Sequence, residues 1–322
     1  MPDDPTTSSQ SKLSFRRAFI QRTAALSTLA ALVPLGTPAL LASENSNSKL
    51  VDTHLHCFAG SEDLRFPYHA RAPYRPTAVA SPEHLLRCMD EAGVAYAVVV
   101  HPEPYQDDHR YLEHCLEIGN GRLKGTCLVF ADRPHAAAKL RDLSTRLPIV
   151  AARVHAYAPG RLPPFGQPEL RDLWKVAADL GLAVQLHFEP RYAPGFEPLI
   201  REFSDTTVII DHLGRPFQGT PQEHAVVIKW AELPNTVIKL SSIPATTSYP
   251  HRDPSQVILQ LSRAFGPERM LYGGGFNAEA TGTSYQAAFE TARRYLPHLS
   301  AAEQNLVLGG NAMKLFNFGG ES

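Results

Sequence analysis

The length, composition and charge of the chain exclude several classes of protein. It has 322 residues, 43% of them hydrophobic, and a formal net charge of −1. This length suits one large α/β barrel or two medium domains, and the composition is that of a globular protein with a sizeable core. Because the net charge is near zero and basic residues are scattered, nucleic acid is not an expected partner. A small-molecule substrate is the expected one, and the sequence is compatible with a homo-oligomer.

Residues 1–45 are typical of an export signal followed by a linker. Arg16 and Arg17 precede an apolar run over residues 24–35. This run is too short to span a bilayer stably, but it suits the core of a signal peptide. The arginine pair resembles a twin-arginine signal, which is an address that a receptor reads. We therefore expect export to the periplasm, membrane contact only through this signal, and a folded domain over residues 46–322. A disordered tail with a chance apolar patch is the alternative.

The four cysteines show no CxxC pair and do not resemble a zinc knuckle or a disulfide-dense scaffold. We expect buried thiols, with one disulfide left open for an oxidising compartment. The cysteines are Cys57, Cys88, Cys115 and Cys127.

Eight short apolar runs follow one another from residue 50 onward, separated by segments with a helical pattern. Continuous apolar runs are typical of strands that are buried on both faces, as in a parallel sheet. The runs are Leu50–His54, Tyr96–His101, Lys124–Ala131, Ile149–Tyr157, Leu182–Phe188, Thr207–His212, Thr236–Ser242 and Met270–Gly274.

The intervening segments carry helix signals. Ser81, Pro82 and Glu83 form an N-cap, a first-turn proline and an acidic residue, and residues 168–180 place their leucines on one face. Similar patterns cover residues 108–118, 134–145, 220–232, 253–265, 284–296 and 300–317. Eight alternations of strand and helix predict a single (β/α)8 TIM barrel. A doubly wound open sheet is the alternative, but no glycine-rich phosphate-binding motif follows the first run.

Four histidines lie at the ends of predicted strands. His54 and His56 end the first run, and residues two apart on a strand point to the same side. His187 closes the fifth run and His212 the sixth. A single histidine at a strand end is more often a structural hydrogen-bonding residue. Four that converge on the C-terminal mouth of a barrel, where such enzymes do their chemistry, predict a shared site, and two imidazoles on one face supply half of a zinc site.

Four segments of the chain carry a resemblance to a known family. They are Val51–His56, Ile209–Pro216 (IIDHLGRP), Val237–Ser241 (VIKLS) and Gly309–Phe318 (GGNAMKLFNF). Over residues 50–318 the chain resembles the amidohydrolase-related family of metal-dependent barrel hydrolases, especially its lactone-hydrolase branch. The resemblance implies that His54, His56 and His187 bind a divalent metal such as zinc, and that His212 is a catalytic residue beside the reacting atoms. It also implies hydrolysis of a small, anionic or sugar-derived lactone, ester or amide by an activated water.

The sequence departs from this family at the end of the eighth strand, where the family carries an aspartate that serves as metal ligand, general base or both. If Phe276 matches the aromatic residue that follows it, Gly275 occupies the aspartate position. Three neutral histidines can still hold zinc, with His212 handling protons. Alternatively, the loss of a base, which typically costs about 10²–10⁴-fold in rate, leaves an impaired enzyme that acts as a small-molecule binding protein. A decarboxylase-like lyase is the third reading.

Three further residues are candidates for substrate binding. Arg153 and Tyr157 share one face of the fourth run. A guanidinium inside a barrel needs a carboxylate, either from a ligand or from an internal partner such as Asp52 or Asp211. Arg215 resembles a family position near the site and could bind a substrate carboxylate. The segment over residues 58–79, rich in Arg, Tyr and Pro, is predicted to cover the mouth.

Overall fold

The computed structural model of the protein describes residues 49–157, 160–247 and 250–320. The predicted export signal therefore lies outside the described residues. Within these ranges, no helix has both the length and the apolar character that crossing a membrane requires.

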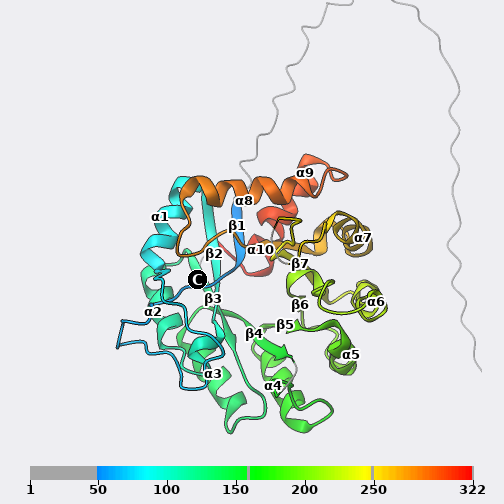
Figure 1. Cartoon of the computed structure of the whole chain (residues 1–322). Coiled ribbons are helices and arrows are strands. Elements are labelled where there is room, and N and C mark those ends of the chain that lie inside the picture. The colour runs from blue at the N-terminus through cyan, green and yellow to red at the C-terminus, as the bar shows by residue number, and fades with distance from the viewer. Residues whose placement is uncertain (1–48, 158–159, 248–249, 321–322) are drawn as a thin grey trace, which may run out of the picture. The chain divides into compact units, whose positions relative to one another are not determined.

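The barrel wall is one eight-stranded parallel sheet in which every strand pairs with the next one in the sequence. The first strand also lies beside the last, so the sheet curves into a nearly closed barrel (Figure 1). The strands are β1 (Leu50–Leu55), β2 (Val94–Val100), β3 (Leu123–Leu128), β4 (Ile149–Ala156), β5 (Ala183–Phe188), β6 (Val208–Ile210), β7 (Thr236–Ser241) and β8 (Met270–Gly273). The predicted (β/α)8 barrel is confirmed, and the open-sheet alternative is excluded.

Helices alternate with these strands and surround the barrel (Figure 1). They are α1 (Pro82–Ala92), α2 (Arg110–Gly119), α3 (Ala136–Arg146), α4 (Pro168–Asp179), α5 (Ala193–Glu202), α6 (Pro221–Lys229), α7 (Ser255–Phe265) and α8 (Gly282–Arg294). Helix α1 begins where the capping residues predicted it. The Ser81 side chain accepts a hydrogen bond from the backbone N–H of His84, and Pro82 occupies the first turn.

Helix α5 is absent from the sequence prediction. Its segment holds Pro194, Gly195 and Pro198, which disfavour a helix. It is helical nevertheless, because burial of Phe196 and Ile200 against the barrel outweighs local propensity.

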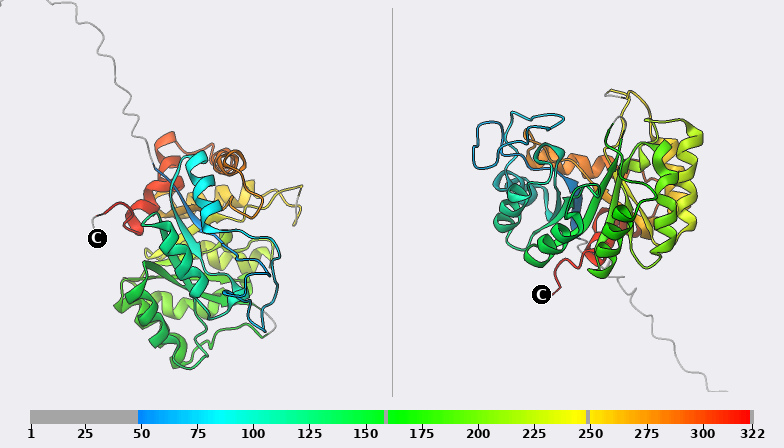
Figure 2. Two further views of the ribbon diagram at one scale, coloured as in Figure 1. Left: turned by 90° about the vertical axis from the view of Figure 1, so that its left-hand side faces the viewer. Right: turned by 90° about the horizontal axis from the view of Figure 1, so that it is seen from below.

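Two hydrophobic cores hold the barrel together. The larger lies between the strands and the ring of helices. The smaller fills the N-terminal end of the barrel, where Val98 and Ile209 are fully buried and Phe316 and Phe318 cover them. The C-terminal end of each strand is thus left for polar groups. Figure 2 shows the 58–79 segment and the segment between β7 and α7 at one end of the barrel, and the C-terminal residues at the other.

The C-terminal segment closes the N-terminal end of the barrel. We predicted one helix over residues 300–317. The structure divides this segment into α9 (Ala301–Asn305), a π-helical turn (Leu306–Gly310) and α10 (Asn311–Leu315).

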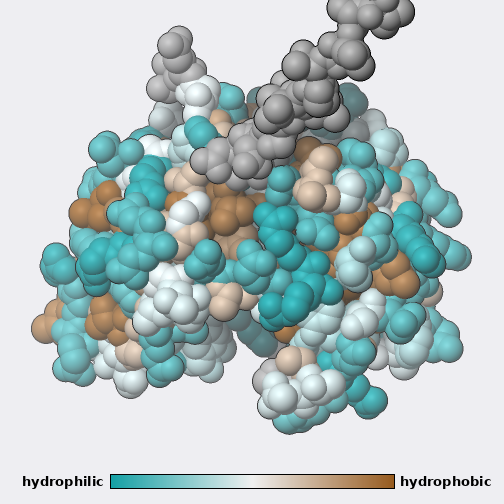
Figure 3. Space-filling model, turned by 90° about the horizontal axis from the view of Figure 1, so that it is seen from above, coloured by the Kyte–Doolittle hydropathy of each residue, from teal (hydrophilic) through white to brown (hydrophobic). Residues whose placement is uncertain are grey.

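The four cysteines are buried free thiols, as predicted. The face seen from above in Figure 3 is mainly hydrophilic, with small scattered hydrophobic groups. The described residues visible in this view therefore form no broad apolar patch of the kind that marks a protein or membrane interface.

Candidate active site

The structure brings the four predicted histidines together at the C-terminal end of the strands. His54 lies on β1, His56 directly after it, His187 on β5 and His212 directly after β6. The ring centroids of His54 and His212 are 4.4 Å apart, those of His54 and His56 are 5.3 Å apart, and those of His187 and His212 are 4.9 Å apart. The imidazoles therefore share one site, and the roles predicted for them remain predictions.

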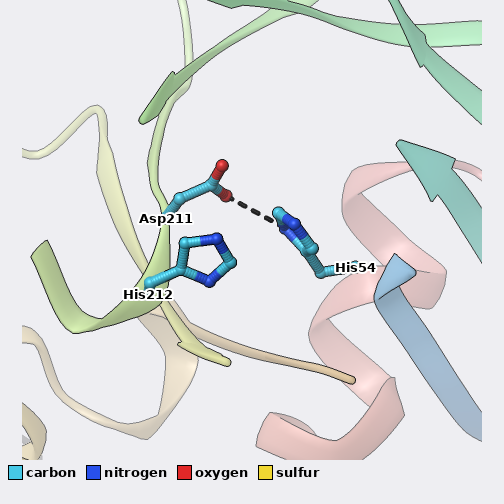
Figure 4. A group of neighbouring side chains, drawn as sticks. All are labelled: His54, Asp211 and His212. Atoms are coloured by element: carbon cyan, nitrogen blue, oxygen red, sulfur yellow. Dashed lines mark ion pairs between the residues drawn. The ribbon is translucent and has the colours of Figure 1, made fainter. Parts of the chain in front are cut away.

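Asp211, the residue before His212, lies beside His54 and His212 (Figure 4). Its carboxylate lies 3.3 Å from Nδ1 of His54 and accepts hydrogen bonds from Arg153 Nε at 2.9 Å and from Gln185 at 3.0 Å. Lys239 Nζ lies 3.6 Å away. All of these side chains are buried, so water screens the attraction between the Asp211 carboxylate and its cationic neighbours only weakly.

Arg153 has an internal partner in the structure. Of the two internal carboxylates named from the sequence, Asp211 is the one that it contacts. Arg153 is only 2% exposed, and two of its guanidinium nitrogens lie 2.9 Å from the same carboxylate oxygen. Arg153 therefore positions Asp211, and the substrate contact predicted for it stays a prediction.

Burial keeps the imidazoles neutral. It holds the pKa values of His54, His187 and His212 well below the usual value, and it lowers the pKa of His56 to about 4. Burial opposes the charged form of Asp211 as well. There, however, the contacts with His54, Arg153 and Lys239 prevail and hold the pKa well below its usual range. The site thus combines a carboxylate with imidazoles whose lone pairs are free.

The donor set fits a divalent metal. The side chains of His54, Asp211 and His212 each offer one ligand atom, and these atoms lie within 4.8 Å of one another. Nε2 of His54 and Nε2 of His187 are buried without a hydrogen-bond partner in the described structure. His56 bonds through Nδ1 to the Val100 carbonyl at 2.7 Å, which fixes its proton there and leaves Nε2 as a lone-pair donor. Neutral imidazoles with one carboxylate suit zinc.

The turn that carries His212 is strained. His212, Leu213, Gly214 and Arg215 all have positive φ, at 54°, 59°, 67° and 56°. Such conformations are unfavourable for residues other than glycine and are concentrated at functional sites. The Ser241 hydroxyl at the end of β7 anchors the turn, because it lies 3.2 Å from the His212 backbone N–H and 2.9 Å from Nδ1.

The same turn presents Arg215 to the mouth. Its Nε donates to the Tyr157 hydroxyl at 2.9 Å, and its guanidinium stacks on the Tyr157 ring. Arg215 and His212 line one cavity of about 290 Å³. Within the described ranges no ion pair engages Arg215, in contrast to Arg153. The guanidinium of Arg215 is therefore available to an anionic ligand.

Comparison with known proteins shows to which family this chain belongs. The model of the amidohydrolase family matches residues 51–318. The chain belongs to the amidohydrolase family. No protein with a curated functional description matches it.

Solved structures share the fold of this amidohydrolase. A proposed 2-pyrone-4,6-dicarboxylic acid hydrolase of Acinetobacter baumannii, crystallised with citric acid bound, has a TM-score of 0.68 and 21% identity over 84% of this chain and 100% of its own. A second such hydrolase, from Pseudomonas putida, has a TM-score of 0.66 and 23% identity over 85% and 99%. An amidohydrolase of Burkholderia multivorans with bound zinc has a TM-score of 0.62 and 18% identity over 84% and 99%.

Gly275 does not face the histidines of this amidohydrolase. Its φ is +106°, and a Cβ atom at this position would lie 2.7 Å from Cβ of Ala288 and 2.9 Å from the ring of Tyr285, both on α8. A side chain at position 275 would therefore point toward α8.

Sequence reasoning missed a second polar chain behind His187. Nδ1 of His187 lies 3.4 Å from Nε2 of His155, and Nδ1 of His155 lies 3.2 Å from a carboxylate oxygen of Glu103. Arg161 also bonds to that carboxylate, at 2.8 Å. Alternation along β4 places His155 on the same face as Arg153 and Tyr157, but it does not predict the contact of His155 with His187 and Glu103. Nothing in the sequence singles out Glu103, which lies in the loop after β2.

Proposed function

We propose that this amidohydrolase hydrolyses a small lactone or ester that carries a carboxylate. The family and the fold are those of hydrolases. The observation that carries the proposal is the cluster of four neutral histidines around Asp211, two buried (His54 and His212) and two half-buried, with Arg215 available beside it. The imidazoles supply metal ligands and a proton carrier, and the guanidinium supplies an anchor for a substrate carboxylate.

His54, His56 and His187, the ligands expected from the sequence, would hold a divalent cation, most simply zinc. Asp211 and His212 would border it, because their donor atoms and one of His54 lie within 4.8 Å of one another. A bound zinc lowers the pKa of a water and polarises a carbonyl oxygen. His212 lies next to these ligands and would exchange a proton with the substrate. Ser241 orients its ring through Nδ1, which leaves Nε2 for that exchange.

Arg215 and Tyr157 would bind the substrate carboxylate. The guanidinium is oriented by the Tyr157 hydroxyl and is not neutralised by an ion pair in the described structure. Similar folds are named for hydrolysis of a pyrone dicarboxylate, and one of them binds citric acid. These likenesses support an anionic substrate here.

A paired measurement of metal content and hydrolysis tests the proposal. Hydrolysis of monophenyl succinate adds water across the ester C–O bond and yields succinate and phenol. We expect about one metal per purified chain and turnover of this ester. His54→Ala should lose both, because it removes one of three ligands. The exposed His251 supplies the control, since His251→Ala should retain both.

Two outcomes would overturn the proposal. A wild type that holds no metal and hydrolyses neither esters nor lactones with a carboxylate, yet binds them, would support a binding protein. Release of CO₂ from carboxylated aromatic compounds without ester hydrolysis would support a lyase.

A further inference from the structure

A cavity of about 680 Å³ opens from the histidines toward β8 and α8. Its inner end is formed by His54, His56 and His212, and Gly273, Gly274 and Gly275 form one side. A Cβ atom on Gly274 would have no neighbour within 4 Å, so the backbone there borders open space. The glycine segment after β8 thus makes room beside the histidines.

The wall of this cavity carries no charged side chain and is mainly apolar. None of the described residues that line it is Asp, Glu, Lys or Arg. Its apolar contributors come from several segments and include Phe58, Ile243, Tyr272, Phe276 and Ala278, while Ser242, Asn277 and Thr291 add neutral polar groups. A second carboxylate placed against this wall, away from the histidines that would hold a metal, would lose water and meet no cation, which is unfavourable.

This apolar cavity meets the Arg215 cavity at the catalytic histidine. His212, Ser242 and Ile243 line both. A substrate whose reacting carbonyl lies at His212 can therefore extend one arm toward Arg215 and the other along the glycine segment. One arm would meet the guanidinium of Arg215, which no ion pair neutralises in the described structure. The other arm would meet uncharged, mainly apolar walls.

We infer that the substrate is an amphipathic monocarboxylate, with its carboxylate on the Arg215 side of the scissile bond and an aromatic or branched apolar group in the cavity beside Gly273–Gly275. The inference rests on the proposed function and narrows its substrate class. A dicarboxylate with charges on both sides of the scissile bond is excluded by the same wall.

Two matched esters test the inference. Monophenyl succinate and mono(4-carboxyphenyl) succinate share the acyl group and differ only by a carboxylate on the ring that would enter the apolar cavity. We expect kcat/KM for the phenyl ester to be higher by about tenfold or more, because the second carboxylate would be desolvated without a partner. Equal values, or a preference for the carboxyphenyl ester, would overturn the inference.

A charge placed on the wall should change this preference. Ala278 is half-buried in the loop before α8 and lines the cavity. Ala278→Lys should reduce the phenyl preference several-fold by offering a cation to the second carboxylate. Ala278→Met, a neutral side chain of similar length, should keep it. If both variants behave alike, the cavity does not receive the ring.

Binding of stable ketone analogues separates this inference from the proposed function. In 4-oxo-5-phenylpentanoate and 5-(4-carboxyphenyl)-4-oxopentanoate a CH₂ group replaces the ester oxygen, so neither can be hydrolysed, and calorimetry gives their Kd values. A preference for the phenyl compound without any ester hydrolysis would support the cavity and contradict the hydrolase. Hydrolysis together with a preference for the dicarboxylate analogue would support the hydrolase and contradict the cavity.

Discussion

At the scale of single residues, three glycines after β8 decide the shape of the site. A Cβ atom on Gly273 would lie 2.5 Å from Cβ of His54, so only glycine lets β8 approach β1 at this point. Gly274 and Gly275 both adopt positive φ, at +132° and +106°. They differ in surroundings, because Gly274 borders open space whereas Gly275 faces α8. The course of this segment therefore depends on glycine at all three positions.

The two neighbouring glycines give a matched prediction. Gly275→Ala should lower the free energy of unfolding by about 2–4 kcal/mol, because backbone strain adds to overlap with Ala288 and Tyr285. Gly274→Ala should cost only the strain, about 1–2 kcal/mol. Urea denaturation of both variants measures the difference. Equal losses would show that α8 moves away without cost, and a side chain at position 275 would then be tolerated.

The sequence predicted the histidines but not their partners. Each predicted histidine follows or ends an apolar run, and strand ends share one edge of a parallel barrel, so their convergence follows from topology alone. The ion pair of Arg153 with Asp211 depends on side-chain reach between β4 and the end of β6. The chain from His187 through His155 to Glu103 depends on the course of a loop. Neither can be read from spacing.

At the scale of elements, the alternation of apolar runs and helical patterns predicted all eight strands. The helix predictions were wrong only where tertiary packing outweighed local helix propensity. Helix α5 forms despite its prolines because its apolar face is buried. The predicted helix over residues 300–317 contains the π-helical turn Leu306–Gly310, where the chain crosses beneath β1. Such turns are frequent at functional or packing constraints, and no sequence period reveals them.

The close approach at this π-helical turn gives a prediction for its glycines. A Cβ atom on Gly309 would lie unacceptably close to the backbone carbonyl oxygen of Lys49, at the start of β1. Gly309→Ala should therefore lower the free energy of unfolding by about 2 kcal/mol or more, because backbone must move. Gly310→Ala should change it by less than about 1 kcal/mol, since its nearest neighbour is the mobile end of Leu306. Thermal and urea unfolding would contradict this account if the two variants were equally stable.

At the scale of the whole molecule, the residues that stabilise the barrel and the residues of the candidate site lie at opposite ends of its axis. The N-terminal end is packed with apolar side chains beneath α10, whereas the C-terminal end concentrates buried charges and imidazoles around Asp211. The charged groups are costly to bury and are retained only by mutual pairing. The apolar end supplies the burial that offsets this cost. The residues proposed to hold a metal come from strands far apart in the sequence, so a metal site made of them would exist only in the folded chain.

This dependence of the site on folding bears on export, the property predicted for residues 1–45. If the barrel acquires the proposed metal on folding, it must either cross the membrane already folded or find the metal outside, and a twin-arginine signal suits the first course. Changing Arg16 and Arg17 together to Lys should leave nearly all precursor in the cytoplasm, because the receptor reads the arginine pair rather than its charge. Cell fractionation with immunoblotting measures this. Lys12→Gln, which alters a nearby charge and keeps the pair, should be exported normally. Equal export of the double-lysine variant would contradict the twin-arginine proposal, and the barrel would then have to take up its metal after translocation.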